Sequence, residues 1–281
     1  MGPVQAFGDV RSTRLIRERR SGRGACGAAE PAPGYAPGVR PANRAHDAVI
    51  VETLDETLAA LESAENYRRW ILELSDPYLD GPILELGAGR GTFTRLLAER
   101  GRVCAVEPSE SLAATLSGTL RDRPDVTVIR GTLDDVAVES SFGSVVMFNV
   151  LEHIEDDRGV LEGILERLAP GGMLILWVPA FPLLFSRFDL MLGHFRRYRL
   201  RPLVEMIEAS SFQVVDARHV NAVGFFSWLV GARLLGRVSA SRRMVSLFDR
   251  IAVPPMRALE RRIVVPFGQS IFVAARKPLD A

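Results

Sequence analysis

The sequence predicts an α/β fold with a sheet of seven mostly parallel strands, helices on both faces, and an antiparallel last strand preceded by a helical insertion. Three observations support this prediction. Short apolar runs alternate with helical patterns through residues 46–281, as in the βα units of a parallel sheet. A glycine-rich turn at residues 87–91 follows the first run, and an acidic residue ends the second. A chain of 281 residues, 47% of them hydrophobic, can also bury one substantial core.

Residues 1–45 are predicted to be a disordered tail outside this domain. They are rich in Gly, Pro, Ala and Arg without apolar periodicity, so they bury too little surface to offset the entropy of ordering. Eight arginines against three acids could form a nucleic-acid arm, but the basic residues are dispersed among prolines and no aromatic platform accompanies them. The net charge of the whole chain is only +1. We therefore expect a solvated tail and no nucleic-acid partner.

Folding proper is expected to start near Asp47, within a single domain spanning residues 46–281. Helices over residues 51–64 and 65–74 precede the first strand, since each has apolar residues three and four apart. We expect these helices, within residues 51–75, to cap the sheet. Tyr67 and Trp70 lie in the second helix, where packing in the core is the simplest role for both.

The first strand, residues 83–86, runs into a turn with glycines at positions 87, 89 and 91, followed by a helix over 93–100. Glycines let the backbone bend sharply and let a ligand lie directly against the main chain. A dinucleotide fingerprint needs its third glycine one place later, where Thr92 stands. A phosphate-binding P-loop is excluded because the chain has one lysine, Lys277, far from the turn. The spacing favours a nucleoside ligand without phosphates.

The second strand, residues 103–107, ends in Glu107, about twenty residues after the glycine turn. A carboxylate at this position can accept hydrogen bonds from both hydroxyls of a ribose. We predict that Glu107 binds the ribose of the ligand.

These residues resemble the pattern of the class I S-adenosylmethionine-dependent methyltransferases, in which an acid precedes three alternate glycines and a second acid ends the next strand. The resemblance extends over residues 64–180, through segments 126–135, 148–154 and 168–172. It implies a Rossmann-like sheet, S-adenosylmethionine as cofactor, and S-adenosylhomocysteine as product. Adenosine is expected between the second acid and the turn after the third strand, and the methionine part against the glycine turn. The implied cofactor-binding residues are Glu85, Gly87, Ala88, Gly89, Gly91, Glu107, Pro108, Leu133, Asp134 and Asn149.

Two features in the middle of the chain concern the backbone. The family usually begins its fourth strand with Phe-Asp, whereas this chain has Phe142-Gly143, and we expect a structural rather than a catalytic consequence. Residues 168–172 are predicted to end a helix and turn into a fifth strand over 173–178, because they contain Pro170 and two glycines.

His153 is the first candidate for a catalytic base. It follows the fourth strand, and open α/β sheets bind their ligands beyond the carboxyl ends of their strands. Its alternative roles are to orient the loop or to cap the helix predicted over residues 156–168.

A second candidate lies in residues 193–198, which are similar to a Gly-His-x-Arg-Arg-Tyr signature in a bacterial subgroup of these methyltransferases. His194 can accept the acceptor's proton because imidazole titrates near neutral pH, with Tyr198 or Asp189 positioning it. Arg196 and Arg197 can bind a carboxylate or phosphate of the acceptor through paired donors. The alternative is a salt-bridged loop involving Asp189 and Glu205. The family also implies that Tyr67 and Trp70 line the acceptor pocket.

The insertion over about residues 220–265 separates the sixth and seventh strands, predicted at 212–217 and 270–275. A minimal fold would join these strands by a short hairpin. The apolar run between Asn221 and Arg233 is too short to cross a membrane, which takes about 20 residues. An amphipathic lid over the acceptor, a dimer interface, and a helix touching anionic lipid remain open.

The function predicted is transfer of a methyl group to oxygen or nitrogen, with carbon as a further option, on an amphipathic or anionic small metabolite. An activated sulfonium methyl needs mainly alignment and removal of one proton, so no metal is expected. The alternatives are a lipid-linked or prenylated substrate, and a non-catalytic cofactor-binding scaffold. The expected partners are a small-molecule acceptor and a second copy of the chain. Two cysteines, Cys26 and Cys104, indicate neither a disulfide framework nor a zinc site, and no signal peptide is evident, so we expect a cytoplasmic protein.

Overall fold

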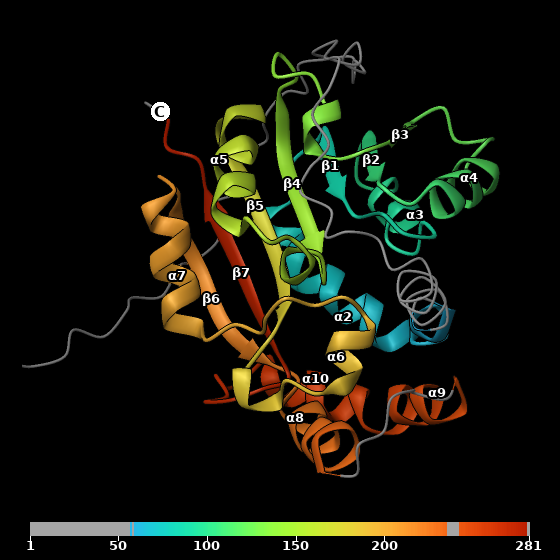
Figure 1. Ribbon diagram of the computed structural model, residues 1–281, viewed down its shortest axis with the longest axis vertical. Coiled ribbons are helices and arrows are strands. Elements are labelled where there is room, and N and C mark those ends of the chain that lie inside the picture. Colours follow the sequence, from blue (N-terminus) through green and yellow to red (C-terminus); the bar gives the residue numbers. More distant parts are fainter. Residues whose placement is uncertain (1–56, 58, 235–241, 280–281) are drawn as a thin grey trace, which may run out of the picture.

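A computed structural model describes residues 57, 59–234 and 242–279 of the chain (Figure 1). Its centre is one seven-stranded sheet with the order β3-β2-β1-β4-β5-β7-β6. Six strands run in the same direction and β7 runs against its neighbours β5 and β6. The predicted sheet is therefore confirmed, including its antiparallel last strand. The strands are β1 Ile83–Leu86, β2 Val103–Glu107, β3 Val126–Arg130, β4 Phe142–Phe148, β5 Leu168–Pro179, β6 Gln213–Val220 and β7 Ser270–Arg276.

The strand order reverses between β1 and β4, which are neighbours in the sheet although β2 and β3 lie between them in the sequence. The connections on the two sides of this point leave toward opposite faces, so a crevice opens beyond the carboxyl ends of the strands. Figure 1 shows helices α6, α8, α9 and α10 gathered beyond that end of the sheet. The fold therefore predicts a ligand site between β1 and β4.

Helices cover both faces of the sheet over two separate apolar cores. One core packs α5 (Asp157–Arg167) and α7 (Leu200–Ala209) onto the sheet through residues such as Leu161 and Ile207, neither of which is exposed. The other core packs α2 (Glu65–Ser75), α3 (Thr94–Leu97), α4 (Glu110–Thr119) and α10 (Val253–Glu260). The remaining described helix before the insertion is α6 (Arg187–Met191), and single turns lie at η1 (Asp76–Tyr78), η2 (Leu133–Asp135), η3 (Leu151–His153) and η4 (Pro182–Leu184).

The start of β4 explains why glycine replaces the aspartate that is usual in the family. A Cβ built on Gly143 would lie 2.6 Å from the carbonyl oxygen of Asp80, because the loop before β1 packs against it. The N–H of Gly143 also donates to the carbonyl of Pro82 at 2.9 Å. The consequence of this residue is therefore structural, as expected.

Strand β5 differs from the prediction. Residues 168–172 were expected to form a turn, but β5 already begins at Leu168, which pairs with Phe142 of β4. The register then shifts, so that the next paired residues are Ser144 and Met173. Gly171, with a φ of +76°, allows this irregularity because glycine carries no Cβ.

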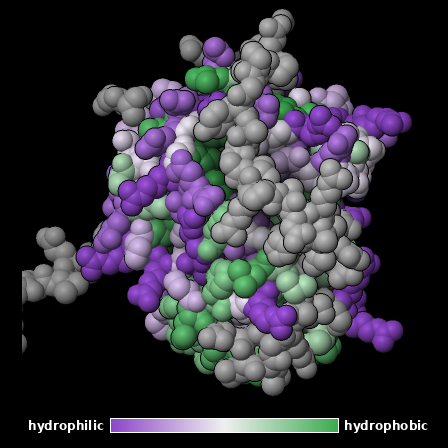
Figure 2. All heavy atoms as spheres, in the orientation of Figure 1, coloured by the Kyte–Doolittle hydropathy of each residue, from purple (hydrophilic) through white to green (hydrophobic). Residues whose placement is uncertain are grey.

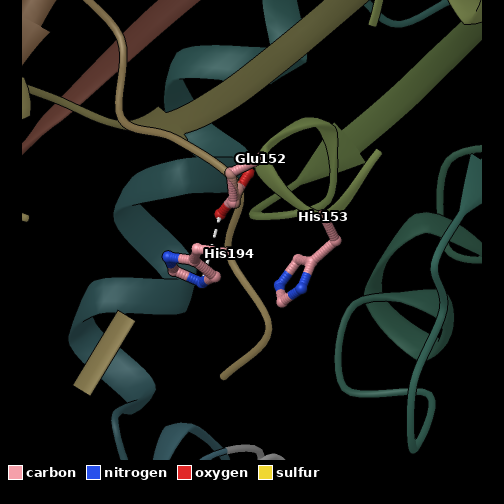
Figure 3. A group of neighbouring side chains, drawn as sticks. All are labelled: Glu152, His153 and His194. Atoms are coloured by element: carbon pink, nitrogen blue, oxygen red, sulfur yellow. Dashed lines mark ion pairs between the residues drawn. The ribbon is translucent and has the colours of Figure 1, made fainter. Parts of the chain in front are cut away.

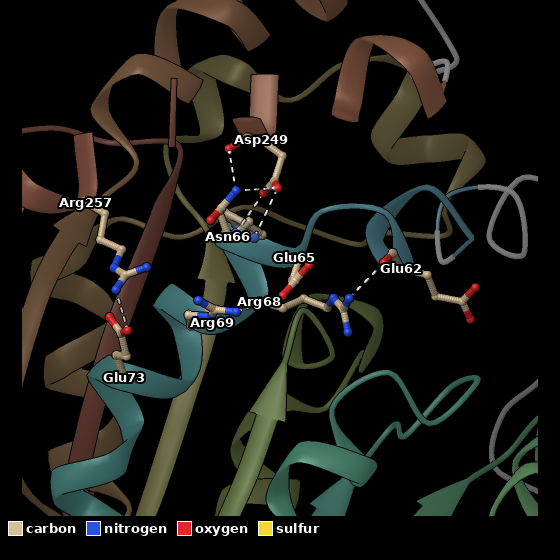
Figure 4. A network of polar contacts seen from close by, with 9 residues as sticks. Glu62, Glu65, Asn66, Arg68, Arg69, Glu73, Asp249 and Arg257 are labelled. Atoms are coloured by element: carbon tan, nitrogen blue, oxygen red, sulfur yellow. Dashed lines mark hydrogen bonds and ion pairs between the residues drawn. The ribbon is translucent and has the colours of Figure 1, made fainter. Parts of the chain in front are cut away.

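The insertion consists of α8 (Ala222–Trp228), the π-helical turn η5 (Leu229–Leu234), α9 (Arg242–Ile251) and α10. Asp249 of α9 accepts hydrogen bonds from the backbone N–H groups of Asn66 and Tyr67, at 3.1 and 2.8 Å, at the start of α2 (Figure 4). Because the first N–H groups of a helix have no partner inside it, this carboxylate caps α2. Arg257 of α10 also pairs with Glu73 of α2.

Polar contacts fix the other end of the insertion as well. Glu260 of α10 accepts from the backbone N–H groups of Asn221 and Ala222, at 3.0 and 2.9 Å, at the start of α8. Direct polar contacts thus hold the predicted cap helix α2 to the insertion, although nearly two hundred residues separate Asn66 from Asp249.

Some expectations concern residues beyond this description. The tail over residues 1–45 lies outside the described residues, and so do residues 51–56 and 58 of the helix predicted over 51–64; residues 57 and 59–62 are helical. Cys104 is buried in β2 and is disulfide-bonded, which corrects the expectation of no disulfide; Cys26 lies outside the described residues. Among the helices described, none has the length and apolar character needed to cross a membrane.

Candidate functional site

A cavity of about 390 Å³ lies in the crevice at the carboxyl end of the sheet. The last residues of four strands line it, namely Leu86 of β1, Glu107 of β2, Phe148 of β4 and Pro179 of β5. Three helices line the side of the cavity away from the strand ends. They contribute Tyr67 from α2, Phe188 from α6 and Trp228 from the insertion. The position matches the ligand site that a doubly wound sheet forms where its strand order reverses.

The glycine turn forms one wall of the cavity. Gly87, Gly89 and Gly91 have φ values of +69°, +57° and +84°, in the left-handed region that other residues rarely adopt. The N–H groups of Gly87 and Ala88 donate to the carbonyl of Val106 at 2.9 and 3.0 Å, which ties the turn to β2. Gly87, Ala88 and Gly89 line the cavity, and the two glycines have no side chain, so a ligand can lie directly against their backbone.

Glu107 lies at the base of this wall and is 5% exposed. One carboxylate oxygen accepts from the N–H of Gly89 at 2.7 Å, and the other from the N–H of Ser109 at 2.8 Å. Burial raises the pKa of Glu107, and these two N–H donors oppose the rise. Each oxygen keeps a second lone pair, so the carboxylate can still accept from two ribose hydroxyls. Pro108, the next residue, also lines the cavity.

Glu85 lies beside the turn, 4% exposed, and accepts from the hydroxyl of Thr94 at 2.6 Å. Burial raises the pKa of Glu85 to about 8, although the Thr94 hydrogen bond opposes this and the charge of Glu107 adds to it. With this pKa, the carboxyl is mostly protonated at pH 7. A cationic ligand group would favour the ionised form.

We expect the affinity for S-adenosylmethionine to rise with pH between pH 6 and 8. Binding of its ammonium group near Glu85 favours loss of the carboxyl proton, so the dissociation constant should fall by up to about tenfold per pH unit while the pH lies below the pKa of about 8. Calorimetric titration in two buffers of different ionisation enthalpy measures the released proton. The variant Glu85→Gln should bind with a much flatter pH dependence; an equally steep dependence in this variant would assign the proton to another group.

Three residues predicted to bind cofactor do not line the cavity. Gly91 packs against α4, since a Cβ there would lie 2.6 Å from Leu116. Leu133 is 8% exposed and belongs to the core beneath α5, and Asp134 is exposed. The structure thus brings neither side chain of the turn after β3 to the cavity. Asn149 does line it, with a φ of +55° and its N–H donating to the carbonyl of Trp177 at 2.7 Å.

His194 lies at the far end of the cavity, held by a buried carboxylate. Its Nδ1 is 3.0 Å from Oδ1 of Asp189, which is fully buried. Asp189 also accepts from the guanidinium of Arg197 at 2.7 Å and from the N–H and hydroxyl of Ser186 at 2.8 Å each. Since a carboxylate only accepts hydrogen bonds, Nδ1 of His194 carries a proton, and in the neutral imidazole Nε2 offers a lone pair.

Glu152 and His153 share this end of the cavity with His194 (Figure 3). Nε2 of His194 is 4.0 Å from Oε1 of Glu152, and the rings of the two histidines lie edge to face at 4.6 Å. Burial raises the pKa of Glu152 to about 8. Burial, with a smaller effect from His194, lowers the pKa of His153 to about 3, so His153 stays neutral and is a weak proton acceptor.

Arg196, Arg197 and Tyr198 all interact with other residues of the protein. Arg197 lines the cavity, but its guanidinium pairs with Asp189 and lies 4.5 Å from the centre of the Trp228 ring. Arg196 pairs with Asp157 at 2.6 Å outside the cavity. The hydroxyl of Tyr198 donates in the core, 3.2 Å from both the carbonyl of Leu151 and the carboxylate of Asp157, and burial raises its pKa. The alternative of a salt-bridged loop therefore describes Arg196 and Arg197, with Asp157 in place of Glu205.

The two aromatic residues of α2 have different positions. Tyr67 lines the cavity, and its hydroxyl accepts from the indole N–H of Trp177 at 3.0 Å. Trp70 is 1% exposed and packs edge to face against Trp177 at 5.8 Å, away from the cavity. Trp70 is thus a core residue, which was the simpler of the two roles considered for it.

Among the lining residues that were not predicted from the sequence, Phe188, Trp228 and Glu152 give the acceptor end its character. Phe188 of α6 and Trp228 of α8 form its apolar wall, with their rings 5.4 Å apart. Glu152 is fully buried at its polar end. Glu152 could have been predicted from the sequence, because it directly precedes the candidate catalytic residue His153. The lid considered for the insertion included Trp228, but the sequence singled out neither aromatic side chain, because α6 and α8 meet only in the folded chain.

The seven-stranded sheet with an antiparallel last strand, and a cavity formed by a glycine turn and an acid at the end of β2, define a class I S-adenosylmethionine-dependent methyltransferase fold. Residues 84–174 match the methyltransferase domain family. The chain therefore contains a methyltransferase domain of this class, whose cofactor is S-adenosylmethionine.

Curated relatives of different specificity match parts of the chain. The ribosomal RNA small subunit methyltransferase A of Anaeromyxobacter dehalogenans is 42% identical over 78 residues, which cover 26% of this chain and 27% of the relative. The C-methyltransferase NovU of Streptomyces niveus is 28% identical over 151 residues, 50% of this chain and 35% of the relative. The chain thus spans only about a quarter to a third of the length of these two relatives.

Solved structures share the fold at low sequence identity. The phosphoethanolamine N-methyltransferase 2 of Haemonchus contortus in complex with S-adenosyl-L-methionine has a TM-score of 0.54 and 18% identity, over 76% of this chain and 52% of that chain. At this level of identity the likeness concerns the fold alone.

Proposed function

We propose that this protein transfers the methyl group of S-adenosylmethionine to an oxygen or nitrogen atom of an amphipathic small molecule. The observation that carries the proposal is the layout of one cavity. Its first half has the glycine turn and Glu107, and its second half has the polar group of Glu152, His153 and His194 beside an aromatic wall. A cofactor bound at the first half would direct its sulfonium methyl toward an acceptor in the second.

The reaction needs alignment and the removal of one proton. The acceptor's lone pair forms a bond to the methyl carbon, and the carbon–sulfur bond breaks with its electrons moving to sulfur, which leaves neutral S-adenosylhomocysteine. The acceptor's proton passes to Nε2 of His194, whose other nitrogen is held by Asp189. Asp189 is a positioning residue because it acts only through the imidazole and Arg197.

The cavity supports an amphipathic rather than a strongly anionic acceptor. Phe93, Phe148, Phe188 and Trp228 contribute apolar surface to its walls. Arg197, the one arginine among the described residues of the lining, is already paired with Asp189. A carboxylate or phosphate on the acceptor would have to compete with that buried pair, whereas an apolar body gains from the aromatic wall.

Calorimetric titration with S-adenosylmethionine, S-adenosylhomocysteine and NAD tests the cofactor half of the proposal. We expect dissociation constants on the order of 1–100 µM for the first two and no binding of NAD. Glu107→Ala should lose this binding, because it removes the acceptor of the ribose hydroxyls. Glu110→Ala, which removes an acid with 84% side-chain exposure from the start of α4, should not. Equal binding by the two variants would contradict the assigned role of Glu107.

Release of S-adenosylhomocysteine, measured across a panel of phenols, amines and hydroxylated lipids, tests the acceptor half. Turnover with any O- or N-nucleophile supports the proposal. Tight cofactor binding without turnover on any member would favour a non-catalytic cofactor-binding scaffold.

A second candidate is methylation of a lipid-linked or prenylated substrate, and a specific observation favours it. An apolar cavity of about 350 Å³ adjoins the first and shares Tyr67, Phe188 and Trp228 with it. Helices α8 and α9 and the turn η5 expose apolar residues beside this cavity, and Figure 2 shows hydrophobic surface at the same end of the molecule. The residues, at least 44% exposed, are Val223, Phe226, Val230, Met244, Leu247 and Ile251.

Arginines 242, 243 and 250 of α9 are exposed as well, so this surface combines apolar and cationic groups. Such a combination is typical of helices that lie on anionic membranes. Cosedimentation with anionic vesicles and turnover confined to prenylated acceptors would favour this candidate over a freely diffusing acceptor.

A further inference from the structure

Glu152 is a buried carboxylate without a hydrogen-bond partner. The residue is fully buried, and neither of its carboxylate oxygens makes a hydrogen bond with another described residue. Burying an ionisable group without a partner is costly, so such a group in a folded protein calls for an explanation. The nearest basic side chain of the cluster, His194, is still 4.0 Å away from Oε1.

Two imidazoles face the same space as this carboxylate (Figure 3). One ligand atom each from Glu152, His153 and His194 can be chosen so that all three lie within 4.8 Å of one another. Ligands about 2.1 Å from one ion lie at most about 4.2 Å apart, so small side-chain shifts would close the set around an ion. The carboxylate then gains the partner that the described part of the chain does not supply.

The surroundings of His194 also match those of a metal ligand. Its Nδ1 is bound to the buried carboxylate of Asp189, so in the neutral imidazole the lone pair of Nε2 is available. A ligating histidine usually donates its second ring N–H to such a carboxylate, which fixes the ring and raises its basicity. Asp189 is itself fixed by Arg197 and Ser186, so the orientation of His194 is set before any ion arrives.

We propose that Glu152, His153 and His194 bind one divalent transition-metal ion, Zn²⁺ or Mn²⁺, at the acceptor end of the cavity. The role of the ion in catalysis rests on the proposed function, whereas the binding of the ion does not. Two imidazoles and one carboxylate suit such ions and leave coordination positions open. Mg²⁺, which prefers oxygen ligands, fits this donor set poorly. The proposal revises the expectation that the protein needs no metal.

An ion at this point would face the acceptor directly, because all three ligands line the same cavity as the glycine turn and Glu107. The acceptor's oxygen would take an open coordination position, and the ion would lower the pKa of its hydroxyl. In the ion-loaded protein His194 is a ligand, so the hydroxyl proton would pass to water rather than to the imidazole. The ion-free protein retains the transfer to His194.

Cobalt(II) is a suitable probe because its visible absorption reports coordination number and ligand type. Titration of the full-length protein with Co²⁺, in the absence of cofactor and acceptor, should give a saturable absorption band with one ion bound per chain. Zn²⁺ should displace it stoichiometrically, whereas a large excess of Mg²⁺ should not. Absence of a saturable band, or displacement by Mg²⁺ at comparable concentration, would overturn the proposal.

Variants assign the ion to these ligands. Glu152→Gln keeps the shape of the side chain but removes its charge, and we expect Co²⁺ affinity to fall by at least tenfold; His153→Gln should have the same effect. Glu155→Gln on the same loop and His219→Gln on β6 are matched controls that should bind Co²⁺ as the unmodified protein does. Equal affinity in Glu152→Gln and Glu155→Gln would place the ion elsewhere and overturn the proposal.

Titration of the same variants with S-adenosylhomocysteine separates this inference from the proposed function. Glu152→Gln should bind S-adenosylhomocysteine normally while losing Co²⁺, because Glu107 and the glycine turn are unchanged. A protein that binds Co²⁺ through these ligands but no S-adenosylhomocysteine would retain the metal site and contradict the methyltransferase function.

Discussion

Replacement of Gly89 by arginine is expected to abolish binding of S-adenosylmethionine, with a dissociation constant raised by at least about 100-fold, or about 2.7 kcal/mol. Gly89 has a φ of +57° and lines the cavity, and its N–H donates to Glu107 at 2.7 Å. A side chain there would enter the space meant for the ligand. Arginine is also less stable than glycine in the left-handed conformation, by about 1–2 kcal/mol. The turn would therefore shift and disturb the hydrogen bond between the N–H of residue 89 and Glu107.

Gly118→Arg is the matched control for this variant. Gly118 lies on the exposed side of α4, and a Cβ built there has no atom within 4 Å. The same side chain should fit there without loss, since arginine also favours a helix over glycine. Calorimetric titration of both variants, with circular dichroism to compare their folds, checks the prediction. A folded Gly89→Arg that binds like the unmodified protein would remove the glycine turn from the cofactor site.

Replacement of His194 by alanine is expected to lower turnover by about 100- to 10,000-fold and to leave the dissociation constant of S-adenosylmethionine unchanged. The imidazole is held by Asp189 at the acceptor end of the cavity, whereas the cofactor residues lie at the other end. Loss of this group therefore affects proton removal, not cofactor binding. The rate of S-adenosylhomocysteine release at saturating cofactor measures the effect.

His153→Ala and His219→Ala complete the comparison. His219 stacks on Phe181 at 4.9 Å and does not line the cavity, so its removal should leave turnover within a fewfold of normal. His153 has a pKa of about 3 and should contribute little as a base, but it should matter if an ion is bound. Unchanged turnover in His194→Ala would exclude His194 both as base and as a required metal ligand.

The sequence predicted the sheet and the cofactor end of the site because these depend on local patterns. A buried strand, alternate glycines and an acid at the end of the next strand are all read within about 25 residues of chain. The parallel neighbours β1 and β2 then bring Glu107 against the turn at Gly89, since the strands end at the same edge. The seven strands were likewise predictable from short apolar runs with turns between them.

The acceptor end was predicted less well because its residues come from distant segments. Arg196, Tyr198 and Trp70 were expected near the acceptor, but each finds a partner in the core or at a loop instead. Their residue types suited binding, yet the sequence did not indicate which side chains Asp157 and Trp177 would engage. Whether such a side chain binds a ligand or another residue of the protein depends on which residues the fold brings next to it.

By itself, the sequence determined the α/β class, the strand order along the chain and the glycine turn with its two acids, because periodicity and backbone freedom act over short distances. Only the tertiary structure decided that Glu152 is buried without a partner beside two histidines, and that Asp249 caps a helix far away in the chain. The physical reason is that desolvation and hydrogen bonding depend on every group packed around a side chain. Those groups come from segments that the sequence does not show to be neighbours.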